Sequence, residues 1–398
     1  MQIRLPERVK YILSRLESAG YRADIVGGSV RDFLLGKEPG DFDITTSATP
    51  EETKAVFADE RTVDTGIKHG TVTLVLDGVP YEITTYRFDG EYNDARHPSS
   101  VAFTRRIEDD LMRRDFTVNA MAYSPNHSIT DLFGGREDVR EGIIRAVGDP
   151  LARFSEDALR ILRAVRFAAT LDFQLEENTK QAIFEKMHLL GNVSAERIYV
   201  ELKKMLGGSS AYSVICDFER LILEIIPELS CITLPDFERF CSASYLSRLL
   251  SIFALSASNP TAAFEGFVAR LRVDNATKNL GLTALSGIGK YDFSTERGIN
   301  YALMMLGENA TRELVLLEIL LGKTDSEAIH RLDALISSGA AYRISDLAVG
   351  GNDLMSLGAS GREIGDLLSL LLLEVVKGNL ENTRDSLIEF AKTCLESK

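Results

Sequence analysis

The chain has 398 residues, of which 45% are hydrophobic and 26% charged, and its formal net charge is −14. This composition is that of a soluble globular protein, and it excludes a disordered chain or one dominated by membrane spans. An acidic chain also argues against a protein that binds nucleic acid over a generally basic surface. The arginines are unevenly distributed, however: twelve lie between Arg96 and Arg166, which leaves room for a local cationic cleft.

The beginning of the chain, MQIRLPERVK, has no apolar stretch, so no signal peptide is expected. Four cysteines without CxxC spacing indicate reduced thiols rather than disulfides or a zinc site, and therefore a cytoplasmic protein. The sequence gives no sign of a membrane partner, and a homodimer is compatible with it. The oligomeric state is left open.

The predicted elements alternate between helix and strand in the first third of the chain. Apolar spacing predicts a helix over 1–20, and ADIVGGSVRDFLLG reads as a strand, a double-glycine turn and a helix. GDFDITT predicts a second strand, Thr49 and Pro50 predict a helix start, and Asp77-Gly78 predicts a hairpin turn. Residues 87–105 are predicted to form a loop, and the pattern then turns helical. A strand-like interlude covers 128–147, and almost only helical periodicity remains from residue 155 onward.

The first candidate site combines Gly27-Gly28 with Asp41 and Asp43. Glycines let a backbone approach a ligand closely, and two carboxylates on one face of a strand can share a hard cation such as Mg²⁺. A DxD pattern alone is more often a solvated turn, and a GG turn alone is often only tight packing. Together, twelve residues apart, they resemble the nucleotidyltransferase superfamily of DNA polymerase β. A third carboxylate is usual in that superfamily, and Glu82 is the candidate, although an exposed strand residue is an equal alternative.

Two further clusters carry charge. In Asp110–Ala120, Arg113 and Arg114 are flanked by aspartates and followed by an apolar run, so part of the cluster is expected to be buried and paired with an aspartate or a phosphate. In 155–167, a helix is expected to carry a polar stripe of Asp157, Arg160, Arg163 and Arg166 on an otherwise apolar surface. A salt-bridged surface stripe is the alternative interpretation of this second pattern.

Six motifs in the same order resemble the bacterial CCA-adding tRNA nucleotidyltransferases, in the class that also includes bacterial poly(A) polymerase. They are VGGSVRD, GDFDI, TGIKHGTVT, EITTYR, EDDLMRRDFTVNAMA and EDALRILRAVRF, and they cover residues 21–167. The resemblance implies an α+β head of the polymerase-β type followed by an elongated all-α neck, body and tail. The expected divisions are 1–139 for the catalytic head, 140–207 for the neck, 208–270 for the body and 271–398 for the tRNA-binding tail.

The resemblance also implies the chemistry. Such enzymes use CTP and ATP to add CCA to the 3′ end of tRNA without a template, with Asp41 and Asp43 holding Mg²⁺. The implied nucleotide-binding residues are Gly28 and Arg31 at the triphosphate, Arg114 closing on the nucleotide, Asp157 and Arg160 reading the base, and Arg163 and Arg166 bracing that pair or touching phosphate.

The resemblance leaves the activity partly open. Residues 87–98 match the flexible loop that complete CCA-adding enzymes use in switching from C to A, which leaves an A-adding enzyme as the alternative. Poly(A) polymerase is disfavoured by a pI near 5.0. A catalytically idle RNA-binding protein and an enzyme acting on a small molecule are further alternatives.

Overall fold

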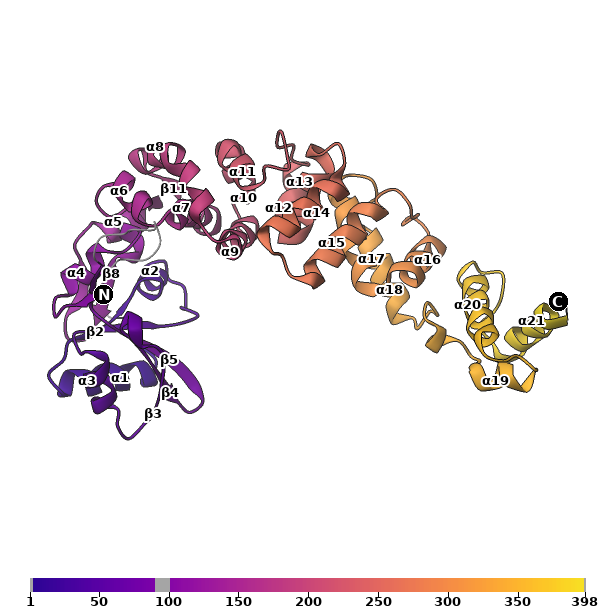
Figure 1. The fold of residues 1–398 in the computed structure, drawn as a ribbon, viewed down its shortest axis with the longest axis horizontal. Helices are drawn as coiled ribbons and strands as arrows, with labels where there is room; N and C mark the ends of the chain where they lie inside the picture. The colour runs from indigo at the N-terminus through magenta and orange to yellow at the C-terminus, as the bar shows by residue number, and fades with distance from the viewer. Residues whose placement is uncertain (1–2, 90–100, 397–398) are drawn as a thin grey trace. The chain divides into compact units, whose positions relative to one another are not determined.

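The computed structural model describes residues 3–89 and 101–396. The chain forms two compact units, Met1–Ile225 and Ile226–Lys398. The first combines a sheet with helices and the second is helical, so the predicted class, an α+β head followed by helical segments, is confirmed (Figure 1). The finer division at residues 139, 207 and 270 stays a prediction.

The head is built on a seven-stranded sheet of order β3-β4-β5-β2-β1-β8-β9. Neighbouring strands are antiparallel except β2 and β5, which run parallel with Ile44 beside Ile83. Val26, the last residue of β1, lies opposite Asp43, the first residue of β2. The double-glycine turn and the aspartates therefore lie at the same end of these two strands. The strands are β1 (Ala23–Val26), β2 (Asp43–Thr46), β3 (Arg61–Gly66), β4 (Thr71–Leu76), β5 (Val79–Thr85), β8 (Met121–Ser124) and β9 (Ser128–Asp131).

Local sequence explains several of these elements. The β4–β5 hairpin turns at Asp77 and Gly78 with φ of 51° and 79°, which a type I′ turn requires. Thr49 accepts a hydrogen bond from the Glu52 backbone N–H, while the Glu52 side chain accepts one from the Thr49 N–H, so α3 begins with a capping box as expected. The helices of the head are α1 (Glu7–Ser18), α2 (Gly28–Leu34), α3 (Pro50–Val56), α4 (Ile107–Met112) and α5 (Gly135–Glu141), with short 3₁₀ turns η1 (Ile67–His69) and η2 (Thr117–Asn119).

The predicted loop over 87–105 is wrong at both ends. β6 (Arg87–Asp89) pairs antiparallel with β7 (Val101–Phe103) to form a separate two-stranded ribbon. Phe103 of β7 packs against Gly70, just before β4: a Cβ on Gly70 would lie 2.8 Å from the ring of Phe103. Residues 90–100, which include most of the loop implied by the family resemblance, lie outside the described residues.

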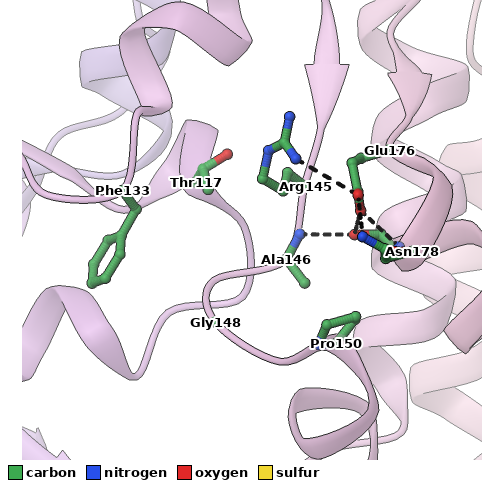
Figure 2. Close-up of a pocket in the computed structure, with 9 residues that line it drawn as sticks. Thr117, Phe133, Arg145, Ala146, Gly148, Pro150, Glu176 and Asn178 are labelled. Atoms are coloured by element: carbon green, nitrogen blue, oxygen red, sulfur yellow. Dashed lines mark hydrogen bonds and ion pairs between the residues drawn. The ribbon is translucent and has the colours of Figure 1, made fainter.

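The strand-like stretch predicted over 128–147 is confirmed at β9 and at residues 143–144, but α5 interrupts it. The rest of the first unit is helical, apart from one short sheet, whose second strand was not predicted. In it, β10 (Ile143–Ile144) runs parallel to β11 (Gln174–Leu175). Arg145, which follows β10, lies 3.2 Å from Asp138. Figure 2 shows its contact with Glu176, at 3.6 Å, in a pocket of about 210 Å³ that both residues line. The helices are α6 (Pro150–Glu156), α7 (Leu159–Leu171), α8 (Glu177–Lys186), η3 (Met187–Asn192), α9 (Ala195–Leu206), α10 (Ala211–Asp217) and α11 (Glu219–Ile225).

The second unit consists of helices in its described part. A buried cluster that includes Leu354, Leu371 and Leu387 joins its last three helices. Within the described residues, no helix is long and apolar enough to cross a membrane. The elements are α12 (Phe237–Ser242), α13 (Tyr245–Ser256), α14 (Pro260–Leu271), α15 (Asn275–Gly287), α16 (Glu296–Leu306), α17 (Glu308–Leu320), α18 (Ala328–Ser337), η4 (Ile344–Asp346), α19 (Gly351–Ser356), α20 (Arg362–Val376) and α21 (Arg384–Glu396).

Candidate active site

The double-glycine turn connects β1 to α2 and approaches two charged side chains. Gly27 has φ of 77°, which favours glycine, and a Cβ at this position would lie 3.2 Å from Arg114 Nη1 and 4.0 Å from Asp43 Oδ2. The turn, the aspartate strand and the arginine motif, which are distant in sequence, therefore meet at one place.

Asp41 and Asp43 lie together, but not in one strand as predicted: β2 begins at Asp43, and Asp41 precedes it. Burial raises the pKa of Asp43, and the nearby carboxylates of Asp41 and Glu82 raise it further, while Arg114 lowers it. The positive charge of Arg114 thus does not fully offset the local negative charge. A divalent cation held by the two aspartates would supply the missing charge, and carboxylate oxygens are the ligands that such hard cations prefer.

Glu82 is the neighbouring acidic residue on the next strand. Ile44 and Ile83 are paired across β2 and β5, so the residues that precede them, Asp43 and Glu82, lie side by side. Glu82 is exposed. Among residues 3–89 and 101–396, no group of three or more His, Cys, Asp or Glu is arranged to hold a metal ion. A metal role for Glu82 stays a prediction.

A cavity of about 200 Å³ opens at Asp43. Arg113 and Arg114 line it, and Arg114 Nε is buried without a hydrogen-bond partner among the described residues, so this donor is available to an anionic ligand. Three other lining residues were not predicted from the sequence: Thr71 and Thr84, which lie opposite each other on β4 and β5, and Arg87 of the ribbon. The alternation of side chains along the hairpin could have indicated the two threonines.

Asp110 is one of the aspartates that flank the arginine pair in the sequence. Its fully buried carboxylate accepts hydrogen bonds from Arg113 Nη2 at 2.7 Å and from Arg114 Nη2 at 3.2 Å. Burial alone would raise its pKa, but the two guanidinium charges outweigh burial and the pKa is lowered. The expectation that the cluster is partly buried and paired is confirmed, and the partner is an aspartate. Its spacing of three and four residues before the arginines was the available signal.

Arg31, the predicted triphosphate ligand, is largely buried on α2. Its guanidinium donates to Asp32 Oδ1 from Nε at 3.0 Å and from Nη2 at 2.8 Å, and to Asn119 Oδ1 from Nη1 at 2.7 Å. Since guanidinium carries five N–H groups, two remain without a partner among the described residues. A Cβ on Gly28 would lie 3.4 Å from Arg31 Nη2, so this side chain lies against the glycine turn.

The predicted stripe on the helix is wrong for Asp157. α6 ends at Glu156, Asp157 is extended, and α7 begins at Leu159, whose N–H donates to Asp157 Oδ1. Asp157 and Arg160 have separate ion-pair partners: Arg197 lies 3.2 Å from the aspartate, and Glu156 lies 2.7 Å from the arginine.

The other two arginines of the predicted stripe, Arg163 and Arg166, lie on α7, which is buried on most sides as expected. Arg163 pairs with Asp115 at 2.6 Å, and Arg166 pairs with Glu201 at 2.9 Å. Burial opposes ionisation of Asp115, but the charge and hydrogen bond of Arg163 outweigh it, so the pKa of Asp115 is lowered. Both arginines are therefore held in fixed positions by carboxylates.

Three protein-family models match the chain. They are described as "Poly A polymerase head domain", over residues 23–145, "Probable RNA and SrmB- binding site of polymerase A", over 172–231, and "tRNA nucleotidyltransferase domain 2 putative", over 305–391. The matches fall in both compact units.

Curated relatives are similar over almost their whole length. A CCA-adding enzyme of Leuconostoc mesenteroides is 36% identical over 96% of this chain and 94% of its own. A CCA-adding enzyme of Lactococcus lactis is 37% identical over 99% and 98%. The crystal structure of the Bacillus stearothermophilus CCA-adding enzyme in complex with CTP is 30% identical, covers 99% of both chains and has a TM-score of 0.79. The chain therefore belongs to the family of CCA-adding enzymes, the tRNA nucleotidyltransferases related to poly(A) polymerase.

Proposed function

We propose that this protein adds C, C and A to the 3′ end of tRNA from CTP and ATP and releases pyrophosphate. The observation that carries the proposal is that Asp43 and Arg114 line one cavity and that both lie against the turn at Gly27. Full-length relatives named CCA-adding enzyme support this activity over A-only addition or poly(A) synthesis.

The reaction transfers a nucleotidyl group to RNA. An oxygen of the RNA 3′-hydroxyl forms a bond to the α-phosphorus of the nucleotide, the bond from that phosphorus to the bridging oxygen breaks, and the hydroxyl proton is lost. Nucleotidyltransferases of this type generally use divalent metal ions, and we propose Mg²⁺ for this chain, held by Asp41 and Asp43. When bound, such ions activate the hydroxyl and offset charge on the phosphates. Arg114 and Arg31 contribute fixed positive charge toward the triphosphate.

We propose that Asp157 and Arg160 choose the base. A carboxylate only accepts hydrogen bonds and a guanidinium only donates them. Cytosine and adenine each present an amino donor beside a ring-nitrogen acceptor, so both match the pair. Uracil and guanine present the opposite polarity and are rejected. Arg160 uses three of its five N–H groups on Glu156 and on the carbonyls of Arg113 and Arg153, which leaves two for a base.

The helical segments would hold the tRNA acceptor arm and elbow, since duplex RNA is recognised mostly through its shape and phosphates. Arg163 and Arg166 would brace the base-reading pair. We place the reaction in the cytoplasm, where tRNA is processed in bacteria.

The test is end-product analysis on three tRNA transcripts that end at the discriminator base, at C or at CC. Each is incubated with Mg²⁺ and CTP, ATP or both. We expect the first transcript to gain CCA and then stop. Extension of the CC-ended transcript alone, by one A, would instead mean an A-adding enzyme.

The metal assignment is tested by replacing both Asp41 and Asp43 with alanine. We expect transfer to fall by at least about 1,000-fold while tRNA binding in a filter assay is retained, because the change removes charge only at the reacting centre. Persistent transfer would contradict the metal assignment.

A further inference from the structure

The side chain of Phe167, on α7, is surrounded by guanidinium groups. It is only 5% exposed, and its ring centroid lies 3.6 Å from Cζ of Arg166, 5.3 Å from that of Arg163 and 5.4 Å from that of Arg31. Two of these arginines lie on the same helix, but Arg31 comes from α2, after the glycine turn. The face of an aromatic ring attracts cations, so one ring connects the two elements.

Each guanidinium also has its own carboxylate, which allows three like charges to surround a single ring. The pairs are Arg31 with Asp32 at 2.8 Å, Arg163 with Asp115 at 2.6 Å and Arg166 with Glu201 at 2.9 Å. The charges of the cluster balance, so its arginines are not driven apart by repulsion. The ring of Phe167 is therefore not needed to neutralise charge, and its contribution is to hold the guanidinium groups in position.

Arg31 is the arginine for which this position matters most. Asp32 and Asn119 take three of its N–H groups, and the ring of Phe167 lies against the same guanidinium. The two remaining N–H groups belong to a side chain that lies beside Gly28. A guanidinium fixed on several sides loses little side-chain entropy when it binds a phosphate.

We infer that Phe167 is a positioning residue for the incoming nucleotide: its ring fixes Arg31 of α2 against α7, so that the free donors of Arg31 are presented at the glycine turn to the triphosphate. This inference rests on the proposed function. It concerns the part that all nucleoside triphosphates share, so it predicts an effect that is equal for CTP and ATP.

The test compares Phe167→Leu, which removes the ring but keeps apolar volume, with Phe167→Tyr, which keeps the ring. For Phe167→Leu we expect KM for CTP and for ATP to rise by the same factor of about ten, with kcat changed by less than about twofold and U and G still rejected. Phe167→Tyr should behave like the wild type. Phe154→Leu is the matched control, because Phe154 is fully buried on neighbouring α6.

If Phe167→Leu lowers the Tm as much as the control and leaves both KM values unchanged, Phe167 only fills the core and the inference is wrong. If that variant does not fold, Phe167→Met replaces it, and calorimetric titration with CTP in the absence of tRNA gives the Kd. A weaker Kd supports the inference, and an unchanged Kd overturns it. A wild-type chain that adds no CCA to tRNA would overturn the proposed function instead. The Kd values of the wild type and the variant for CTP would still decide the role of Phe167.

Discussion

Asp110→Asn removes a buried charge beneath the candidate site and keeps the shape of the side chain. The carboxylate of Asp110 is fully buried and accepts from Arg113 Nε at 3.0 Å, Arg113 Nη2 at 2.7 Å and Arg114 Nη2 at 3.2 Å. Breaking a buried ion pair costs about 3–5 kcal/mol. Asparagine keeps one acceptor oxygen and both arginine side chains reach solvent, so we expect the free energy of unfolding to fall by about 3 kcal/mol at pH 7.

The pH dependence follows from the lowered pKa of Asp110. A carboxylate with a lowered folded-state pKa adds stability above its unfolded pKa, about 3.9, and this stability is lost as pH falls through the folded value. The difference between the wild type and Asp110→Asn should therefore be constant near neutral pH and should shrink in acid.

The assay is urea denaturation followed by circular dichroism at pH 7 and pH 3, together with the KM for CTP at pH 7. Asp109→Asn is the matched control: Asp109 is the preceding residue on α4, is only partly buried and accepts a hydrogen bond from Thr104 Oγ1 at 2.7 Å. We expect this control to cost about 1 kcal/mol. An Asp110→Asn cost no larger than that of the control, or a difference that grows in acid, would refute the reasoning.

Three other substitutions test the site and the second unit. Gly27→Ala should cost about 1–3 kcal/mol, because Gly27 has φ of 77° and ψ of −131°, a conformation that favours glycine, and it should slow transfer by displacing Arg114. Gly20→Ala is the control: Gly20 also has a positive φ, of 87°, but has open space around it, so transfer should be unchanged in the same end-product analysis on tRNA. Burial raises the pKa of Glu313, so its charged form is unfavourable in the fold. Glu313→Gln should therefore raise the free energy of unfolding by about 1 kcal/mol at pH 7, as measured by urea titration. Below about pH 4.3 the carboxyl group is protonated in both states, so a gain that persists there would contradict this. Asp157→Ala should increase incorporation of UTP and GTP relative to CTP, measured with each nucleotide alone, and unaltered selectivity would argue against a base-reading role.

Short-range signals predicted the parts of the head whose geometry is set locally. Asp77-Gly78 fixes the hairpin because both residues must adopt positive φ, and Thr49-Pro50 starts a helix because the threonine caps its first turn. The glycine turn and Asp43 were also predicted next to a strand end. The ribbon of β6 and β7 was missed because each strand is three residues long and its partner lies across an eleven-residue insertion, so no local pattern records the pairing.

The position of Asp157 shows how side-chain chemistry can interrupt a periodic pattern. The spacing of 157, 160, 163 and 166 is helical, but Asp157 Oδ1 accepts from the N–H of Leu159 and so starts a new helix instead of continuing the old one. Its charge partner, Arg197, lies on α9, forty residues further along the chain. Only tertiary packing determines that contact, so the sequence pattern carried no signal for it.

The strand of Asp43 has partners on both edges, since β2 lies between β5 and β1 in the sheet. Its amide protons should therefore be among the slowest of the head to exchange with deuterium, because releasing them requires the sheet to open as a whole. The ribbon that carries Arg87 has one partner strand for each of its two strands, and a two-stranded ribbon is marginal on its own. Two residues that line the cavity are thus held very differently: Asp43 lies on a strand that opens only with the whole sheet, and Arg87 lies on a ribbon whose local opening requires far less free energy.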